Sequence, residues 1–403
     1  MYNTQQHSSK LSNNAPVITA TAVLPSAPLY TPLPQDKTAS SASGAPLNDK
    51  QIQQLEAQGF THSLAESIND VKKHFPLRIW VVDNSGSMHQ DDGHRIIDRV
   101  TSAGDQSSVR MVPCTRWAEI SSCVEYHMRL AALVEAPTRF RLLNPSRDPT
   151  IPSTFSIGER HYYDSPNDRS YEAEDAAEQF RRTEPHGATP LTKHIREIHA
   201  EIVEMAPALR RTGQRVCLVL ATDGLPTDDY GSSGEVHRQR FVEALRNLEG
   251  LPVWVVIRLC TDDEDVVSFW NDIDAILELD IDVLDDFTAE AKEIEEFNPW
   301  INYALPLHRL REFGNHDRLY DLIDEREFTR SEARDFCSIL FGKDSFDGVP
   351  DPNADWQSYL THLSSITQQA GKVWNPLQRR PKKWVSVNRL RRGKSAARWL
   401  LCS

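Results

Sequence analysis

Three short, almost wholly apolar runs constrain the fold of this chain more than any other sequence feature. They are Leu77–Val82, Val216–Thr222 and Pro252–Leu259. Strands that are apolar on both faces are typical of the centre of a parallel sheet covered by helices. Segments with helical periodicity alternate with these runs along the chain. The sequence therefore predicts an α/β fold with a doubly wound, mostly parallel sheet and helices on both faces, in a Rossmann-like arrangement.

The remaining expected elements follow from amphipathic periodicity and from capping and turn residues. Strands are expected at 110–112, 139–143 and 282–284. Helices are expected at 49–73 with a break at Gly59, and at 95–102, 121–134, 172–183, 192–209, 236–248, 266–277, 319–325, 329–342 and 351–371. The dense Pro, Ser and Asp content of residues 144–171 predicts a long loop.

Polar side chains follow two of the apolar runs at the point where each strand ends. The sequence Asp83-x-Ser85-x-Ser87 comes directly after the first run, and Asp223 follows the second. Between them, a loop rich in Gly and Pro presents the hydroxyl of Thr189. In open α/β sheets, ligands bind at the carboxyl ends of the strands. Carboxylate and hydroxyl oxygens are hard ligands that suit Mg²⁺ or Mn²⁺, so these residues predict a divalent metal site.

The order of the three motifs is more specific than any one of them. Asp-x-Ser-x-Ser, then Gly-x-Thr-Pro-Leu, then Thr-Asp-Gly-x-Pro resembles the metal-ion-dependent adhesion site (MIDAS) of von Willebrand factor A (vWA) domains. The family positions are filled by Asp83, Ser85, Ser87, Thr189 and Asp223. The resemblance implies one bound divalent cation, Mg²⁺ or else Mn²⁺ or Ca²⁺. In the family, the serines and, with ligand bound, the threonine contact the metal, while the aspartates act mostly through water. One coordination position stays open for a carboxylate of a protein partner.

Two less specific interpretations of these residues stay open. Ser85 and Ser87 are typical helix N-cap residues and Asp223 is a typical turn residue, so the motif could serve local structure alone. Alternatively, the site is intact and only holds the fold, because a fold does not by itself establish a function.

The composition along the chain predicts five segments. Residues 1–48 are rich in Ser, Thr, Ala, Pro and Asn and are expected to be disordered. A helical lead-in and the vWA-like domain follow, then a helical region and a basic end that carries tryptophans. The expected ranges of these four segments are 49–75, 76–295, 296–370 and 371–403.

The basic end contrasts with the rest of the chain. The whole chain has a net charge of −13, and without this end the remainder carries −23. Residues 371–403 hold ten basic residues and no acidic residue, together with Trp374, Trp384 and Trp399. Tryptophans among basic residues could stack on single-stranded nucleic acid, or the charges could bind an anionic membrane. Packing on the chain's own acidic body is the favoured interpretation, because no recognisable nucleic-acid module accompanies the segment.

Composition also bears on location. No apolar run reaches the ~18 residues of a membrane span, and the first residues lack the pattern of a secretory signal. The six cysteines are scattered without the spacing of a disulfide framework or a zinc site. A reducing, intracellular location is therefore expected, in the cytoplasm, with the nucleus also compatible.

The resemblance implies a binding protein and not an enzyme. We expect an adaptor, or a subunit of a larger complex, that recruits an acidic protein ligand through the cation. A metal-independent scaffold is the first alternative. A metal-dependent phosphotransfer enzyme is less favoured, because Ser85 stands where such enzymes usually carry a second aspartate. The sequence also has no Gly-x-x-x-x-Gly-Lys-Ser/Thr loop.

Overall fold

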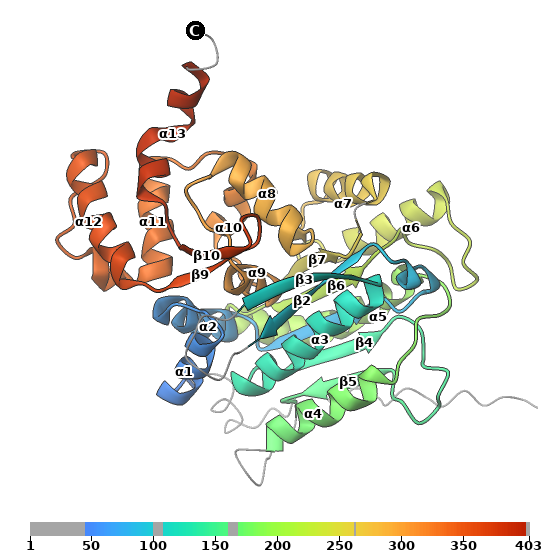
Figure 1. The fold of residues 1–403 in the computed structure, drawn as a ribbon. Helices are drawn as coiled ribbons and strands as arrows, with labels where there is room; N and C mark the ends of the chain where they lie inside the picture. Colours follow the sequence, from blue (N-terminus) through green and yellow to red (C-terminus); the bar gives the residue numbers. More distant parts are fainter. Residues whose placement is uncertain (1–44, 100–107, 160–167, 262, 400–403) are drawn as a thin grey trace, which may run out of the picture. The chain divides into compact units, whose positions relative to one another are not determined.

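The three apolar runs lie at the centre of a six-stranded sheet (Figure 1). The computed structural model describes residues 45–99, 108–159, 168–261 and 263–399. The strand order is β5-β4-β1-β6-β7-β8. The strands are β1 (Leu77–Val82), β4 (Thr138–Leu142), β5 (Thr154–Ile157), β6 (Val216–Thr222), β7 (Val253–Leu259) and β8 (Ile281–Leu284). All neighbours are parallel except the edge strand β5, which is antiparallel to β4. The predicted α/β class with a mostly parallel sheet is confirmed.

Burial explains why these runs are apolar. Every residue of β1 and of β6 is buried. The charged exception in β1 is Arg78, whose Nε donates to the carbonyl of Phe313 at 2.9 Å and whose guanidinium carbon lies 3.8 Å from the centre of the Phe313 ring. Its other nitrogens donate to the carbonyls of Phe75 and Val71. Each of the three guanidinium nitrogens therefore has an acceptor, which lowers the cost of burying the charge.

Long helices alternate with the sheet strands, as the periodicity predicted. They are α3 (Arg116–Leu133), α4 (Asp168–Arg181), α5 (Leu191–Thr212), α6 (Glu235–Arg246) and α7 (Glu264–Ile276). In α5, the expected apolar face is buried at Ile195, Ile198, Ile202 and Met205. None of the helices in the described ranges is long and apolar enough to cross a membrane.

The expected helix at 95–102 is wrong over residues 95–99, and its remaining positions lie outside the described residues. Strand β2 (Gly93–Arg99) occupies this position and pairs antiparallel with β3 (Ser108–Cys114) in a separate two-stranded sheet. The β-branched Ile96 and Ile97 favour a strand. In so short a segment periodicity does not separate the two states, and pairing with β3 decides.

Two further boundaries differ from expectation. Helix α3 begins at Arg116, five residues before the expected start, because the Thr115 side chain accepts from the Ala118 N–H and caps it. The expected loop at 144–171 contains strand β5 and the beginning of α4. Strand β5 is short and lies at an edge, so its sequence carries little periodic signal.

Two helices precede the sheet, α1 (Asp49–Ala57) and α2 (His62–His74). The break expected at Gly59 is confirmed. Asn48 and Gln51 form a capping box at the start of α1. Of the segment expected to be disordered, residues 1–44 lie outside the described residues. In the remainder, the Leu47 N–H donates to the side chain of Asn69.

The chain after β8 is mainly helical. Its elements are α8 (Phe287–Phe297), α9 (Leu305–Glu312), α10 (Arg318–Glu325), α11 (Arg330–Phe341), the 3₁₀ turn η3 (Lys343–Phe346), α12 (Trp356–Gln369), β9 (Lys372–Asn375), β10 (Arg380–Lys383) and α13 (Val387–Trp399). The predicted capping box of Thr329 and Glu332 opens α11, which ends at Gly342. Helix α12 starts later than expected, because Asp351 forms a turn and Asp355 is the cap.

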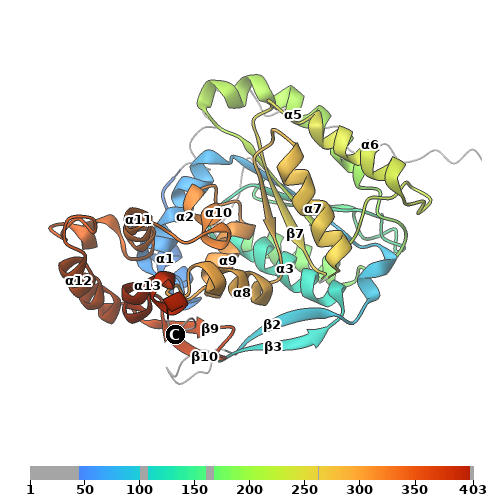
Figure 2. The same ribbon diagram turned by 90° about the horizontal axis from the view of Figure 1, so that it is seen from above.

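The described part of the basic segment packs on its own chain. Strands β9 and β10 form an antiparallel hairpin that lies close to β2 and β3 (Figure 2). Trp384 and Val385 are buried, and Val385 forms an isolated β-bridge with Ile301. Arg389 also pairs with Glu295. Apolar burial and backbone pairing therefore stabilise this segment together with the ion pair of Arg389.

Candidate metal centre

The sheet order brings two of the predicted acids together. Strands β1 and β6 are parallel neighbours, with Val82 opposite Ala221. Asp83 directly follows β1, and its N–H donates to the carbonyl of Ala221 at 2.9 Å. Asp223 directly follows β6. Both acids therefore leave the same edge of the sheet, and both are buried.

Four of the five predicted residues form one continuous chain of hydrogen bonds. The Ser85 N–H donates to Asp83 Oδ1 at 2.8 Å. The hydroxyl oxygens of Ser85 and Ser87 lie 3.0 Å apart. Ser87 Oγ then donates to Asp223 Oδ1 at 2.9 Å. Ser87 and Asp223 are thus bonded directly although they lie 136 positions apart in the sequence.

The loop of Thr189, the fifth residue, lies against the Asp83 loop. The Gly86 N–H donates to the carbonyl of Gly187 at 3.1 Å, and the His186 N–H donates to that of Asn84 at 2.6 Å. Gly187 has φ +81°, and a Cβ there would lie 2.7 Å from Oδ1 of Asn144. The positive φ and the Asn144 side chain at this point both favour glycine at position 187.

Thr189 itself is nearly buried, with 6% of its surface exposed. Its N–H donates to Thr227 Oγ1 at 2.9 Å, and its carbonyl accepts from the Thr227 N–H at 2.9 Å. The backbone of Thr189 is therefore fixed, while its hydroxyl is not part of the chain of bonds that joins the other four residues.

The two acids sit in an environment that disfavours their charges. Burial, and then the negative charge of Asp223, raise the pKa of Asp83 to about 7. Burial also raises the pKa of Asp223. A cation placed between such groups favours their ionised forms, since opposite charges interact strongly where water is excluded.

Sequence reasoning missed one residue of this centre, Arg116 in the first turn of α3. Its Nη1 donates to Asp223 Oδ2 at 3.0 Å. Its Nε and Nη2 donate to the two carboxylate oxygens of Asp92, each at 2.6 Å. Arg116 is 107 positions from Asp223, and nothing in the local sequence signals the contact.

All four carboxylate oxygens of the two acids have donors without a cation. Thr222 Oγ1 donates to Asp83 Oδ2 at 2.7 Å, and the other three oxygens accept from Ser85, Ser87 and Arg116. A serine hydroxyl has two lone pairs besides its proton, so it can donate to a carboxylate and still ligate a metal. The donor set therefore fits Mg²⁺ or Mn²⁺, which prefer carboxylate, hydroxyl and water oxygens.

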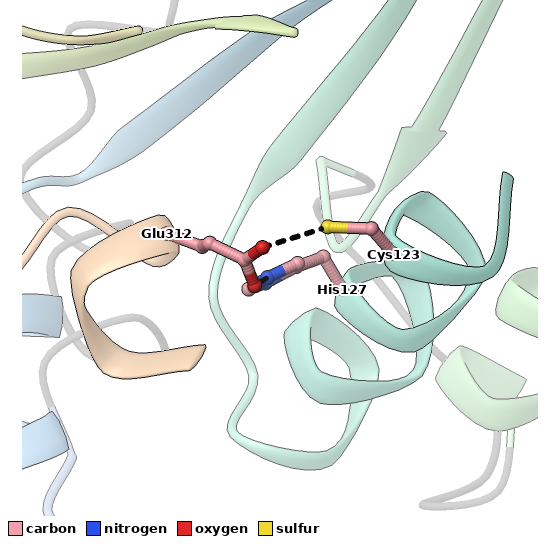
Figure 3. A group of neighbouring side chains, drawn as sticks. All are labelled: Cys123, His127 and Glu312. Atoms are coloured by element: carbon pink, nitrogen blue, oxygen red, sulfur yellow. Dashed lines mark hydrogen bonds and ion pairs between the residues drawn. The ribbon is translucent and has the colours of Figure 1, made fainter. Parts of the chain in front are cut away.

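A second buried cluster has metal-ligating residue types but a different charge balance (Figure 3). Cys123 Sγ donates to Glu312 Oε1 at 3.2 Å, and His127 Nε2 lies 3.0 Å from Glu312 Oε2. The same carboxylate accepts from Arg258 Nε at 3.0 Å and from Arg309 Nη1 at 2.8 Å. Two guanidinium groups in contact with the carboxylate oppose a divalent cation, so this cluster is a hydrogen-bonded charge network.

The pKa directions agree with that interpretation. Although burial acts in the opposite direction, Arg309 and the other surrounding donors hold the pKa of Glu312 well below its usual range. Burial, and then the charge of Glu312, raise the pKa of the Cys123 thiol. A thiol held neutral is neither a good nucleophile nor a good metal ligand.

Comparison with known protein families finds no family that matches this chain, and comparison with curated proteins finds no matching relative.

Proposed function

We propose that this chain is a vWA-type protein, with helices on both faces of its sheet, that binds one divalent cation and recruits a protein partner through it. Mg²⁺ is the first choice of cation, with Mn²⁺ or Ca²⁺ as alternatives. The proposed site consists of Asp83, Ser85, Ser87, Thr189 and Asp223. The observation that carries the proposal is the hydrogen-bonded chain from Asp83 through both serines to Asp223 at the edge of β1 and β6.

The chemistry of the site suits an acidic partner. The hydroxyls of Ser85 and Ser87 are neutral ligands, so they leave most of the cation's charge for an incoming carboxylate. Asp83 and Asp223 would hold these hydroxyls in place and balance part of the charge. We therefore place the chain among adaptors or subunits of an intracellular complex, and not among enzymes.

Calorimetric titration with MgCl₂, MnCl₂ and CaCl₂ tests the cation. Asp83→Asn keeps an acceptor for the Ser85 N–H but removes the charge, and we expect it to abolish binding. Asp229→Ala is the matched control, because Asp229 is an exposed acid a few residues after the motif. It should bind like the wild type. The proposal fails if the folded wild type binds none of the three cations.

A pull-down from cell extract, with and without chelator, tests the partner. Proteins retained by the wild type should be lost with chelator and with Asp83→Asn, and kept with Asp229→Ala. Peptides with Asp or Glu at the contact position should compete, whereas their Asn or Gln analogues should not. An unchanged set of retained proteins under chelation would contradict metal-dependent recruitment.

A second candidate function is a scaffold in which the same residues hold the sheet edge without metal. The observation that favours it is the set of donors, Arg116 among them, that satisfies every carboxylate oxygen of Asp83 and Asp223. In that case Asp83→Asn should change the stability of the protein, while chelation should change neither its stability nor its partners.

A further inference from the structure

Arg116 brings a permanent positive charge into the candidate metal centre. Its side chain is 6% exposed, and its Nη1 donates to Asp223 Oδ2 at 3.0 Å. A guanidinium stays protonated in proteins, so this charge cannot be removed by a change of pH. The five-residue motif has no counterpart of this residue. One of the two acids that would face a metal ion is therefore already paired with a cation of the chain itself.

Arg116 is held by a second, stronger contact on its other side. Asp92 accepts two hydrogen bonds from the guanidinium, each at 2.6 Å, which is the bidentate arrangement that gives the most stable Arg–carboxylate pairs. The carboxylate of Asp92 is 44% exposed. Because Nε and Nη2 bind Asp92 while only Nη1 reaches Asp223, Arg116 can release Asp223 and still remain paired.

The backbone around this contact is packed closely. The Arg116 N–H donates to the carbonyl of Gln90 at 2.9 Å. A Cβ on Gly93 would lie 2.7 Å from the carbonyl oxygen of Thr115, so only glycine allows β2 to start directly against the first turn of α3. The segment that carries Asp92 and the helix that carries Arg116 are thus fixed against each other. The guanidinium can release Asp223, but it stays close to the centre because it remains paired with Asp92.

On the premise of the proposed function, we propose that Arg116 competes with the divalent cation for Asp223 and keeps the metal affinity of the free protein low. A single positive charge beside a buried site repels a divalent ion, and it also neutralises part of the negative charge of Asp223 that would balance the ion. A partner's carboxylate adds the missing negative charge, so metal and partner should bind cooperatively. Such coupling is reciprocal, because each ligand raises the affinity of the other by the same factor.

Two substitutions at Arg116 separate its charge from its shape. Arg116→Gln removes the charge and keeps hydrogen-bond donors, and calorimetry on the chelator-treated full chain should show Mg²⁺ binding about tenfold tighter than in the wild type. Arg116→Lys loses the bidentate geometry but keeps the charge that repels the ion, so it should stay within about threefold of the wild type. Circular dichroism and the melting temperature with chelator check that both variants fold. Equal or weaker Mg²⁺ binding by folded Arg116→Gln overturns the inference.

Asp92 gives an independent test that does not touch Arg116. Asp92→Asn removes the second partner of the guanidinium, so Arg116 should hold Asp223 more firmly and Mg²⁺ affinity should fall about threefold or more. Asp91→Asn is the matched control, because it removes the same charge from the adjacent exposed residue. If both variants lose affinity equally, general electrostatics explains the effect and the inference is wrong.

The outcomes also distinguish this inference from the proposed function. If the wild type binds Mg²⁺ and Arg116→Gln binds it no better, the role of Arg116 is refuted and the metal site stands. If only Arg116→Gln binds Mg²⁺, the competition is supported and the wild type is a metal-independent scaffold. If neither binds any divalent cation, the proposed function fails, and the inference that rests on it fails as well.

Discussion

Two buried polar clusters in the described part of this protein differ in how their charges are balanced. At the sheet edge, Asp83 and Asp223 lie beside one guanidinium, that of Arg116, which pairs with Asp223 and with Asp92. In the interior, the carboxylate of Glu312 contacts two guanidinium groups, and Arg258 also pairs with Glu119. At the edge, the acids outnumber the single guanidinium. In the interior, the numbers of acids and of guanidinium groups are equal.

The difference shows that residue type alone does not define a metal site. Cys123, His127 and Glu312 are zinc-ligand residue types, yet the cations already present make that cluster complete. Asp83 and the two serines are weaker ligands individually, but they lie where negative charge is in excess. The comparison therefore predicts that an added cation binds at the sheet edge, and that the interior cluster serves stability.

The largest expected effect is loss of stability when Glu312 is neutralised. Glu312→Gln leaves Arg258 and Arg309 without their shared carboxylate, and breaking a buried charge pair in this way costs about 3–5 kcal/mol. Urea denaturation followed by circular dichroism measures it. Glu295→Gln is the control at the exposed pair with Arg389 and should cost less than about 1 kcal/mol. A small effect at Glu312 would contradict the charge-network interpretation.

The next effect is a pH dependence of the free energy of unfolding, which arises at His308 beside the interior cluster. Burial lowers the pKa of His308 to about 4, so between the ordinary value of about 6.5 and pH 4 only the unfolded chain binds this proton. The groups that act on it are Tyr303, Arg258, Arg309 and Glu312. The free energy of unfolding should therefore fall as the pH drops through this window, by up to about 3 kcal/mol.

His308→Gln removes that contribution, so the stability difference between wild type and variant should shift in favour of the variant as the pH is lowered from 7 to 4. Denaturation curves at several pH values measure this shift. His62→Gln, at an exposed histidine, is the control variant. A variant that parallels the wild type across the whole range would show that His308 takes up its proton normally.

Metal addition and removal should give a smaller effect, confined to the sheet edge. With Mg²⁺ at a concentration well above its dissociation constant, the free energy of unfolding of the wild type should rise by about 1–3 kcal/mol. Thermal unfolding with and without chelator measures this gain. Asp83→Asn should lose this gain and Glu295→Gln should keep it. A metal-dependent gain that survives in Asp83→Asn but disappears in Cys123→Ser would reverse the comparison of the two clusters.

The smallest effect is expected for Cys123→Ser. A serine hydroxyl replaces the thiol as a donor to Glu312, so stability should change by about 1 kcal/mol or less. Zn²⁺ titration of the two proteins is the sharper measurement, and their binding curves should coincide. Loss of a tight Zn²⁺ site in the variant would show that the guanidinium groups do not exclude a cation from the interior.

Much of the fold followed from local sequence. Strands β1, β6 and β7 were predicted nearly to the residue, because apolar residues on both faces of a strand reflect burial that any central position imposes. Strand β2 was not predicted, because whether this segment forms a strand or a helix depends on its pairing with β3. Helix α8 was also not anticipated, and α9 was covered only by the helical region expected at 296–370.

For the site, the sequence by itself determined which hard-ligand residues follow the strands, since motif order and strand ends are both visible in one dimension. Only the tertiary structure decided which charges surround them. Arg116 meets Asp223 across 107 positions, and Glu312 meets His127 across 185. Such contacts leave no periodic or spacing signal in the chain, because they arise from the packing of α3 against the sheet edge and against α9. The balance of buried charge, and with it the response of each cluster to a cation, is therefore a property of the folded protein.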